Sequence, residues 1–403
     1  MVIRTETKTV IMTSTFYPPF HIGGDAVHVK YLAEELTRRG HEVHVLHSID
    51  AYRLKSGGTL PREEATGVHL HPVESGAGRV SPVLTFLTGS NRRAERMLER
   101  LMKEESPDWI HHHNISLLGA RILTVGNVPK LYTAHDYWLA CQRSDLLCPG
   151  HGECEDQRCF RCSVRSVRPY QMWRSSTLRK GISMIDLFIA PSAFMASVLR
   201  QRLGIEAVVI PNFAPRPSIE GSGRVSERYF LFASVLEKHK GLDLLLDAYR
   251  NGDAISGLHI AGRGNLEGLV REREREMGGK IRYLGFLDRD ELLSEIRSAL
   301  AVVLPSQCPE NSPLSCIEAL ALGTPIIVSG RGGLPELVDD PQSGLICGPS
   351  AGEISEVLRR MEGDSELRDR LSKNALLRYE RNHTPEHYVD AYMNRVERIV
   401  LAS

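Results

Sequence analysis

The sequence predicts an α/β protein in which each half of the 403 residues forms a doubly wound domain. Three observations predict this fold class. A strand, a glycine loop, a helix and a strand follow one another near the start, a second series of apolar strands and amphipathic helices begins at residue 229, and a stretch rich in proline and glycine, residues 211–226, separates the two series. A chain of this length suits two domains of roughly 200 residues each better than one core.

The first half alternates strands and helices in the order expected of a parallel sheet. An apolar strand at residues 10–13 is followed by a loop at 17–25 and by a helix over 26–39. The next segment, HEVHVLH, alternates as a strand does, which completes one unit of a Rossmann-like domain. Further strands of this half are expected at residues 109–112, 130–133, 187–190 and 207–210.

The second half repeats this logic, so two domains are expected at residues 1–213 and 214–384. Two such domains facing a central cleft would bind a ligand there, because ligands of open α/β sheets bind at the carboxyl ends of the strands. A last helix is expected at residues 385–400. The strands of this half are expected at residues 229–234, 258–261, 281–284, 301–304 and 326–328.

Composition narrows the range of functions. Fifty basic residues balance fifty acidic ones and aromatic residues make up only 6%, so neither a basic surface nor a stacking platform points to nucleic acid. No apolar run approaches the roughly 18 residues of a membrane span, and the start lacks the long apolar core of a secretory signal. A cytoplasmic protein is therefore expected.

One segment, PSQCPENSPLSCIEALALGTPIIVSGRGGLPELV, is the most informative about function. We expect a turn over residues 305–311 and then a helix with Ser312 as N-cap and Pro313 at its first position, whose free amides would face an anion. Glu310 in the turn and Glu318 in the helix can both reach a molecule that carries hydroxyl groups beside a phosphate, as a ribose diphosphate does. Two carboxylates taken alone are more often solvated surface acids.

Residues 304–338 resemble the donor-binding signature of the retaining glycosyltransferases of family 4, where two acids enclose seven residues ahead of an EAxAxGxP run. The resemblance implies the GT-B architecture of two facing Rossmann-like domains, with residues 385–403 forming a helix that crosses back to the N-terminal domain. It also implies that Glu310 lies near the sugar and that Glu318 binds the ribose hydroxyls. The backbone of Ser312, Pro313 and Leu314 is then expected near the diphosphate. The matching residues are Glu310, Glu318, Ala319, Ala321, Gly323, Pro325, Gly332, Gly333, Pro335 and Glu336.

The family also has a Lys-Gly pair that opens a helix, and Lys240 and Gly241 match it. The resemblance puts the lysine on the donor diphosphate, where a cation stabilises the departing nucleotide. Many members carry an arginine five residues before this lysine, but this chain has Val235. Either another cation, such as Lys238 or Arg263, substitutes for that arginine, or one lysine suffices.

Gly262 and Gly264 follow an expected strand, as in dinucleotide-binding enzymes. The fingerprint of those enzymes is incomplete here, because Glu267 stands where the third glycine belongs. The resemblance instead places both glycines against the donor nucleotide and Phe286 beside its base. Asp288 begins a DxD sequence that is expected to cap a helix, and no catalytic metal is expected.

Candidate residues of the first half follow its strands. His135 ends a strand, where ligands of parallel sheets bind, and the resemblance makes it the residue that contacts the transferred sugar. His113 and Asn114 match an HxHN pattern after an earlier strand. Gly23 and Gly24 either let the backbone approach the donor phosphate or the acceptor at a helix start, or form a plain tight turn.

Five cysteines lie within residues 141–162, directly after the sequence HDYW, and a subset of the family carries a similar segment. Cys159 and Cys162 have the spacing of a metal knuckle, and Cys148 and Cys154 can complete four thiolates for a structural zinc ion. Disulfides, free thiols and an iron–sulfur cluster are the alternatives. The following residues, 158–180, hold seven basic residues and no acidic one, which indicates either a solvated face or peripheral contact with anionic lipid.

Together these patterns predict a retaining glycosyltransferase without a catalytic metal. It is expected to move a sugar from a nucleoside diphosphate sugar to a hydroxyl of a lipid-linked acceptor or small glycoside, in polysaccharide, glycolipid or other glycoconjugate biosynthesis. The alternatives are a nucleotide-sugar 2-epimerase of the same architecture, glycosylation of a small-molecule natural product, and a regulatory module that binds nucleotide without turnover.

Overall fold

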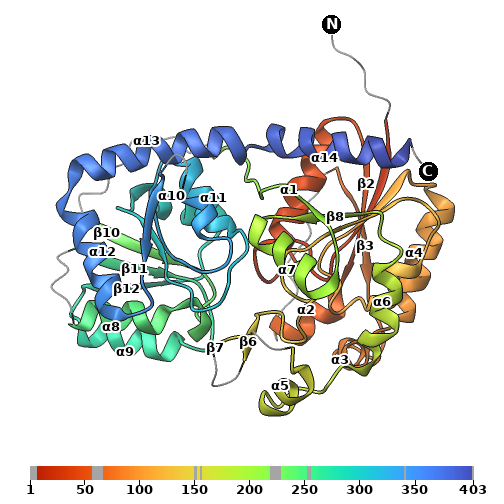
Figure 1. The fold of residues 1–403 in the computed structure, drawn as a ribbon, viewed down its shortest axis with the longest axis horizontal. Helices are drawn as coiled ribbons and strands as arrows, with labels where there is room; N and C mark the ends of the chain where they lie inside the picture. Colours follow the sequence, from red (N-terminus) through yellow and green to blue (C-terminus); the bar gives the residue numbers. More distant parts are fainter. Residues whose placement is uncertain are drawn as a thin grey trace, which may run out of the picture. The chain divides into compact units, whose positions relative to one another are not determined.

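The computed structural model describes residues 7–56, 67–148, 152–154, 157–217, 228–251, 256–339 and 342–401. Parts of the expected boundary stretch, residues 211–226, and of the cysteine segment, residues 141–162, lie outside this range. The chain divides into two compact units, one made of Met1–Ile210 with Tyr388–Ser403 and the other of Pro211–His387. Each unit has one main parallel sheet with helices packed around it (Figure 1).

The first unit contains a seven-stranded sheet in the order β3-β2-β1-β4-β5-β8-β9, and every neighbouring pair is parallel. The chain starts inside the sheet and winds outward in both directions, which brings the carboxyl ends of β1 and β4 together. Its strands are β1 (Thr9–Thr13), β2 (Glu42–Ser48), β3 (His69–Val73), β4 (Trp109–His112), β5 (Lys130–Thr133), β8 (Leu187–Ala190) and β9 (Ala207–Val209).

Local sequence explains where the helices of this unit begin. Asn91 caps α4 by accepting a hydrogen bond from the Ala94 amide, and Ser192 caps α7 in the same way through Met195. A short antiparallel ribbon joins β6 (Leu147–Cys148) to β7 (Gly152–Glu153). The helices are α1 (Gly24–Arg38), α2 (Ile49–Ser56), α3 (Val80–Thr88), α4 (Arg92–Glu104), α5 (Cys159–Arg165), α6 (Thr177–Ile182) and α7 (Ala193–Leu203), with 3-10 turns at Ala120–Thr124 and Met172–Ser175.

The second unit contains a six-stranded sheet in the order β12-β11-β10-β13-β14-β15, again parallel throughout. The side chains of its central strands are fully buried, as in Phe230, Ile260 and Val303, because helices cover both faces of a parallel sheet. Its strands are β10 (Tyr229–Ala233), β11 (Gly257–Ala261), β12 (Ile281–Gly285), β13 (Val302–Leu304), β14 (Ile326–Ser329) and β15 (Gly344–Cys347).

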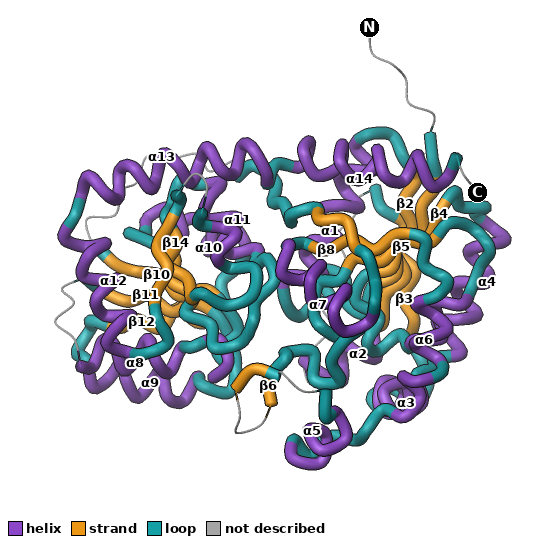
Figure 2. The backbone as a smooth tube through the Cα atoms, viewed as in Figure 1, coloured by secondary structure: helices purple, strands orange, loops and turns teal. Residues whose placement is uncertain are grey.

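Two helices of the second unit start with capping boxes. Asp288 and Glu291 form one at α10, which confirms that Asp288 caps a helix, and Ser350 and Glu353 form the other at α12. Figure 2 shows the helices around this sheet. They are α8 (Leu242–Asn251), α9 (Glu267–Glu276), α10 (Arg289–Ser298), α11 (Leu314–Ala321), α12 (Ala351–Gly363) and α13 (Ser365–Asn382), with 3-10 turns at Lys238–Lys240 and Pro335–Leu337.

The start of α11 differs from the sequence prediction. The prediction that Ser312 caps this helix with Pro313 at its first position is wrong, because α11 begins at Leu314 and Pro313 is the N-cap residue with an extended ψ of 129°. A hydrogen bond of 3.0 Å from Nδ2 of Asn212 holds the Ser312 carbonyl outside the helix.

The last helix, α14 (Pro385–Val400), belongs to the first unit from Tyr388 onward. Its Tyr392 hydroxyl accepts a hydrogen bond of 2.8 Å from Nε1 of Trp109 in β4 and lies 3.1 Å from Nδ1 of His111. All three side chains are buried, so the end of the chain completes the core around β4.

Candidate functional site

Lys240 and Glu310 form a buried ion pair in the second unit. Lys240 ends the 3-10 turn after β10, and Glu310 lies in the loop after β13, the strand that pairs with β10. Nζ of Lys240 is 2.6 Å from Oε1 of Glu310, and the two side chains are only 20% and 11% exposed. The same carboxylate oxygen accepts a hydrogen bond of 2.8 Å from Oγ of Ser306.

Each member of this pair keeps the other charged. Burial acts to raise the pKa of Glu310, but the Lys240 ammonium and the hydrogen bonds to the carboxylate outweigh it and hold this pKa below its usual value. Burial acts to lower the pKa of Lys240, and Glu310 outweighs it and raises this pKa. An ammonium and a carboxylate therefore stand together at the carboxyl edge of the sheet.

Two glycines make this arrangement possible. Gly241 has a φ of +75°, and a Cβ atom there would collide with the carbonyl oxygen of Pro305. Gly332 has a φ of +64°, and a Cβ atom there would collide with the backbone of Glu310. The Gly333 amide also donates a hydrogen bond of 2.7 Å to the Glu310 carbonyl. Only glycine combines this backbone conformation with this close approach, so both loops depend on it.

The helix that follows carries the other residues expected at the donor. Glu318 is a buried residue of α11, and its Oε1 lies 4.0 Å from the guanidinium of Arg289. Within the part of the chain that the structure describes, the buried Oγ of Ser312 has no hydrogen-bond partner. A buried hydroxyl beside the free amides at the start of a helix is suited to an anionic ligand.

Gly262 and Gly264 make close contacts within the second unit itself. A Cβ atom at Gly262 would collide with the Ser234 carbonyl, and one at Gly264 would collide with the backbone of Leu236. The two loops after β10 and β11 can therefore pack against each other. Phe286 follows β12 and is 61% exposed.

Lys238 and Arg263, considered as substitutes for the arginine that many family members have at the position of Val235, lie in different surroundings. The Arg263 guanidinium carbon lies 5.1 Å from the centre of the Phe286 ring, a cation–π distance. Nζ of Lys238 lies 4.0 Å from the Asp243 carboxylate, and its side chain is exposed. Arg263 thus stands beside the residue expected at the base, and Lys238 stands beside an acid of α8.

In the first unit, histidines gather at the carboxyl ends of β4 and β5. Nδ1 of His113 lies 3.0 Å from Nε2 of His135, and the two rings are stacked. His28 of α1 lies against His135 with ring centres 4.9 Å apart, although sequence reasoning had not selected it. The structure therefore brings together two of the expected histidines and adds a third.

The remaining histidines of β4 have packing roles. Nε2 of His111 lies 2.8 Å from the Thr133 hydroxyl, and Nδ1 of His112 lies 2.8 Å from the Thr13 hydroxyl. Burial lowers the pKa of His112 and of His135 to about 3, and it lowers the pKa of His28, His111 and His113 well below the usual value. This cluster is uncharged at neutral pH.

Two acids near these histidines were not selected from the sequence. Asp25, in the first turn of α1 beside Gly23 and Gly24, accepts a hydrogen bond of 2.8 Å from Nδ2 of Asn114. Burial, aided by the charge of Asp25, raises the pKa of Asp136 to about 7. Two features of the sequence could have identified these acids as site residues: Asp25 directly follows the glycine loop, and Asp136 directly follows His135.

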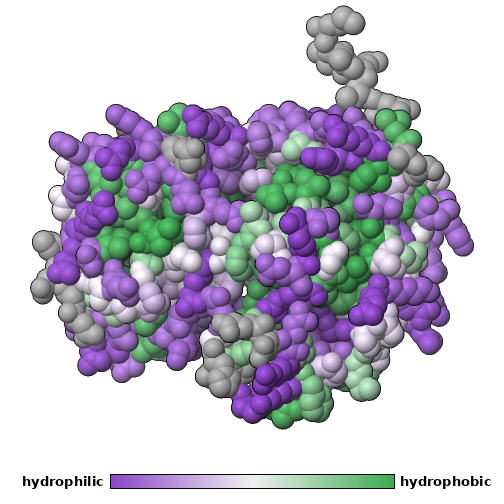
Figure 3. Space-filling model, viewed as in Figure 1, coloured by the Kyte–Doolittle hydropathy of each residue, from purple (hydrophilic) through white to green (hydrophobic). Residues whose placement is uncertain are grey.

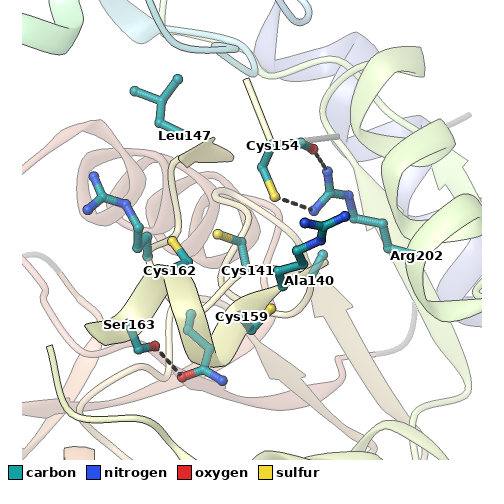
Figure 4. Close-up of a pocket in the computed structure, with 11 residues that line it drawn as sticks. Ala140, Cys141, Leu147, Cys154, Cys159, Cys162, Ser163 and Arg202 are labelled. Atoms are coloured by element: carbon teal, nitrogen blue, oxygen red, sulfur yellow. Dashed lines mark hydrogen bonds between the residues drawn. The ribbon is translucent and has the colours of Figure 1, made fainter. Parts of the chain in front are cut away.

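The cysteines form one cluster. Figure 4 shows the sulfur atoms of Cys141, Cys154, Cys159 and Cys162 around one pocket, so Cys141 joins the expected set. Burial and then the neighbouring Cys154 thiol raise the pKa of Cys148 to about 12, and Cys162 adds to this effect. Nη1 of Arg202 lies 3.7 Å from Sγ of Cys154. Among the described residues, no three of these sulfur atoms lie within 4.8 Å of one another.

The basic side chains of the segment 158–180 are exposed, with one exception. Arg174 is largely buried against Trp138 and Trp173, with its guanidinium carbon 5.0 Å and 5.8 Å from the two ring centres, and it donates to the Leu139 carbonyl at 2.9 Å. This arginine therefore holds the segment in place and does not contribute to a basic surface. In the described part of the chain, we find no helix with the length and hydropathy to cross a membrane.

Comparison with known families gives a consistent result for both halves of the chain. The family described as "Glycosyltransferase Family 4" matches residues 22–215. The family described as "Glycosyl transferases group 1" matches residues 219–378.

Comparison with individual proteins also finds glycosyltransferases and proteins of similar structure. An uncharacterized glycosyltransferase of Methanocaldococcus jannaschii is 26% identical over 385 residues, which cover 91% of this chain and 92% of that protein. The sucrose-phosphate synthase of Thermosynechococcus elongatus has a similar structure, with a TM-score of 0.76 at 19% identity over 98% of this chain and 100% of that one. The Anabaena protein HepE, solved in complex with UDP-glucose, has a TM-score of 0.70 at 14% identity over 97% of this chain and 99% of that one.

Proposed function

We propose that this chain, a glycosyltransferase of the group 1 and family 4 type with the GT-B fold, transfers a sugar from a nucleoside diphosphate sugar to an acceptor hydroxyl with retention at the anomeric carbon. The observation that supports this most is the buried Lys240–Glu310 pair, close in sequence to a helix start where the Ser312 hydroxyl has no hydrogen-bond partner among the described residues. A neighbour of the same fold was solved with UDP-glucose, which supports a nucleotide sugar as the co-substrate.

The residues of the second unit bind the donor in this proposal. Lys240 and the backbone N–H groups of Ser312 and Leu314, on either side of Pro313, hold the diphosphate, since an ammonium and amides at a helix start both favour an anion. Glu318 accepts hydrogen bonds from the ribose hydroxyls. Gly262, Gly264 and Phe286 border the nucleoside.

Glu310 and His135 orient the sugar. The bond between the anomeric carbon and the phosphate oxygen breaks, the acceptor oxygen bonds to the same face of that carbon, and the departing phosphate takes the acceptor proton. The positive charge of Lys240 stabilises the phosphate that leaves, so we propose no catalytic metal. Gly23 and Gly24, at the start of α1, lie beside donor phosphate or acceptor.

Loss of the ribose contact gives the sharpest test of this site. Donor hydrolysis and transfer should both disappear in Glu318→Ala, whereas Glu356→Ala, an exposed residue of α12 outside the donor-binding signature, is the control. Screening UDP-, GDP-, ADP- and TDP-sugars for protection against thermal unfolding identifies the base. Full activity of Glu318→Ala would contradict the ribose assignment.

A nucleotide-sugar 2-epimerase remains the alternative enzyme, because it shares this architecture and a similar donor site. The donor incubated without acceptor distinguishes the two, since only an epimerase returns an isomerised nucleotide sugar. Glycosylation of a small-molecule natural product differs in the acceptor alone, so an acceptor panel that includes small glycosides separates it from polysaccharide or glycolipid synthesis.

A lipid-linked acceptor is supported by an exposed apolar face on the first unit. α3 exposes a stripe at helical spacing, and α5 with the loop after it exposes further apolar side chains beside Arg161 and Arg168. Figure 3 shows hydrophobic and strongly hydrophilic residues side by side along the lower margin, where Figure 1 places α3 and α5. Apolar side chains flanked by arginine fit an anionic membrane surface. The exposed apolar residues are Val80, Val83, Leu84, Leu87, Phe160, Val164, Val167 and Met172.

Liposome flotation tests this peripheral contact. Binding to vesicles with anionic lipid should weaken in Leu84→Ser with Leu87→Ser and in Arg168→Gln with Arg179→Gln, and vesicles of neutral lipid should bind little in every case. Arg200→Gln, on α7, is the control. Unchanged flotation of both double variants would remove the lipid proposal without affecting the donor site.

We also propose a structural zinc ion on Cys148, Cys154, Cys159 and Cys162. Three of these cysteines, Cys154, Cys159 and Cys162, line one pocket, which supports it, although a bound zinc would have to draw the sulfur atoms to about 3.8 Å from one another. Metal analysis of the purified protein distinguishes zinc from iron, and thiol counting distinguishes free thiols from disulfides.

A further inference from the structure

A second group of titratable side chains lies at the amino ends of the strands of the first unit, at the opposite edge of the sheet from His113 and His135. Glu42 and His44 are two residues apart on β2 and so face the same side. Glu105 follows the last turn of α4 as its C-cap residue. Three elements of the chain therefore converge here, since β3 also begins at this edge with His69.

The distances within this group are those of ligands around a small ion. Nε2 of His44 lies 3.4 Å from Oε1 of Glu42 and 3.7 Å from Oε2 of Glu105. These three atoms all lie within 4.8 Å of one another, and no other group of three potential ligands in the described residues does so. Ligand atoms that surround zinc as a tetrahedron, at roughly 2.0–2.1 Å from the metal, are about 3.3 Å apart.

The histidine at the centre of the group is the independent observation that points to a ligand. His44 is only 3% exposed, and its buried Nε2 has no hydrogen-bond partner among the described residues. Its other nitrogen, Nδ1, lies 3.0 Å from Nε2 of His71, which fixes the orientation of the ring. When Nδ1 donates that hydrogen bond, Nε2 turns a lone pair toward two carboxylates. A cation between the three atoms removes the resulting repulsion.

We infer that Glu42, His44 and Glu105 form a binding site for a divalent transition-metal ion of the Zn²⁺ class, with His69 as the nearest further ligand. Imidazole combined with carboxylates and no thiolate suits such an ion. Nε2 of His69 lies 3.9 Å from Oε1 of Glu42, but its ring stacks on that of His44 with ring centres 4.8 Å apart, so it would have to turn to bind the same ion. The ion would fasten the end of α4 to the edge strands β2 and β3, away from the proposed donor site.

Metal binding by the full-length protein tests this site. After chelator treatment and dialysis against Zn²⁺, Glu105→Gln and Glu42→Gln should bind one zinc ion fewer per chain than the wild type, or bind it at least about 100-fold more weakly. Glu104→Gln is the matched control, because Glu104 is adjacent to Glu105 but exposed and 3.4 Å from Arg100. Every variant keeps all the cysteines, so any zinc held by them contributes equally.

Thermal unfolding gives a second readout that does not depend on counting ions. Addition of Zn²⁺ should raise the unfolding midpoint of the wild type and of Glu104→Gln more than that of Glu105→Gln. The inference is overturned if all four proteins bind the same number of zinc ions with dissociation constants within twofold of one another. Loss of sugar transfer is expected in none of these variants, so this outcome is independent of the proposed activity.

Discussion

The buried ion pair between Lys240 and Glu310 makes a quantitative prediction about the second unit. Coulomb's law with an effective dielectric constant of about 20 gives roughly 6 kcal/mol for unit charges separated by 2.6 Å, and desolvation of the two groups offsets much of this attraction. Removing one partner leaves the other charge buried and uncompensated, which costs about 3–5 kcal/mol in comparable sites. Because the two side chains keep some exposure, we expect Lys240→Met to destabilise the second unit by about 2–4 kcal/mol.

The distribution of tryptophan provides an assay for one unit at a time. The three tryptophans, Trp109, Trp138 and Trp173, all belong to the first unit, and the second unit has none. Tryptophan fluorescence therefore follows unfolding of the first unit, whereas far-UV circular dichroism follows both. In Lys240→Met, the circular dichroism transition should acquire an earlier phase at lower denaturant concentration, and the fluorescence transition should stay where it is.

A double-mutant cycle isolates the interaction itself. Lys240→Met, Glu310→Gln and the double variant should give a coupling free energy of at least about 1.5 kcal/mol, because the second substitution removes the stranded charge. Lys238→Met is the control, since this neighbouring lysine is exposed and 4.0 Å from Asp243. A coupling below about 0.5 kcal/mol, the usual size for exposed pairs, would refute the claim that the pair is buried and electrostatically linked.

Three further predictions address other features. Gly241→Ala and Gly332→Ala should each destabilise the second unit by about 1–3 kcal/mol, because the positive φ and the collision with Pro305 or Glu310 both oppose a Cβ atom; chemical unfolding measures this. The pKa of Asp136 is about 7 in the folded state and about 3.8 in the unfolded state, so the folded state binds this proton more tightly. The contribution of Asp136 to the unfolding free energy should therefore fall by about 2–3 kcal/mol as pH rises from 5 to 8. The unfolding free energy of Asp136→Asn should lack that decline, and equal pH slopes for variant and wild type would contradict it. Tyr392→Phe removes the hydroxyl that hydrogen-bonds to both the Trp109 indole and His111. It should lower the unfolding free energy of the first unit by about 1–3 kcal/mol, measured by tryptophan fluorescence. Tyr170→Phe, at an exposed tyrosine, is the control.

The sequence predicts the central strands of both sheets closely because they are apolar runs bounded by turns. The expected strands at residues 109–112, 130–133 and 187–190 coincide with β4, β5 and β8. The edge strand β3 is different, since its sequence HLHPV has one apolar face at most and a proline, and no strand was expected there. Edge strands owe their conformation to a neighbour, which a local pattern does not contain.

Helix α3 shows a second limit of pattern reading. Residues at helical spacing, such as Val80, Val83 and Leu87, normally mark the face that a helix buries, yet these side chains are exposed. Arg174 is the reverse case, a basic residue in a basic run that packs against two tryptophan rings. Periodicity gives the orientation of a face but not what covers it.

The candidate site was predictable as a set of residues and not as a set of contacts. Motif spacing selects Lys240 and Glu310, but they are 70 positions apart, and their bond depends on the pairing of β10 with β13 and on two glycines. Asp25 and His28 reach the histidine cluster only because α1 follows β1, the neighbour of β4. Cys141 lines the same pocket as Cys154, Cys159 and Cys162, which the spacing of the cysteines in the sequence does not show.

Because residues from Tyr388 onward return to the first unit, synthesis of this protein has an imposed order. The ribosome synthesises residues 211–387 before Tyr392, whose hydroxyl bonds to Trp109 in the core of the first unit. The first unit therefore cannot complete its core until the second unit has been synthesised. A nonsense mutation that removes only the last turns of the chain would therefore damage the half that was translated first. A fragment ending at residue 210 would need α14 supplied as a separate peptide to reach its native packing.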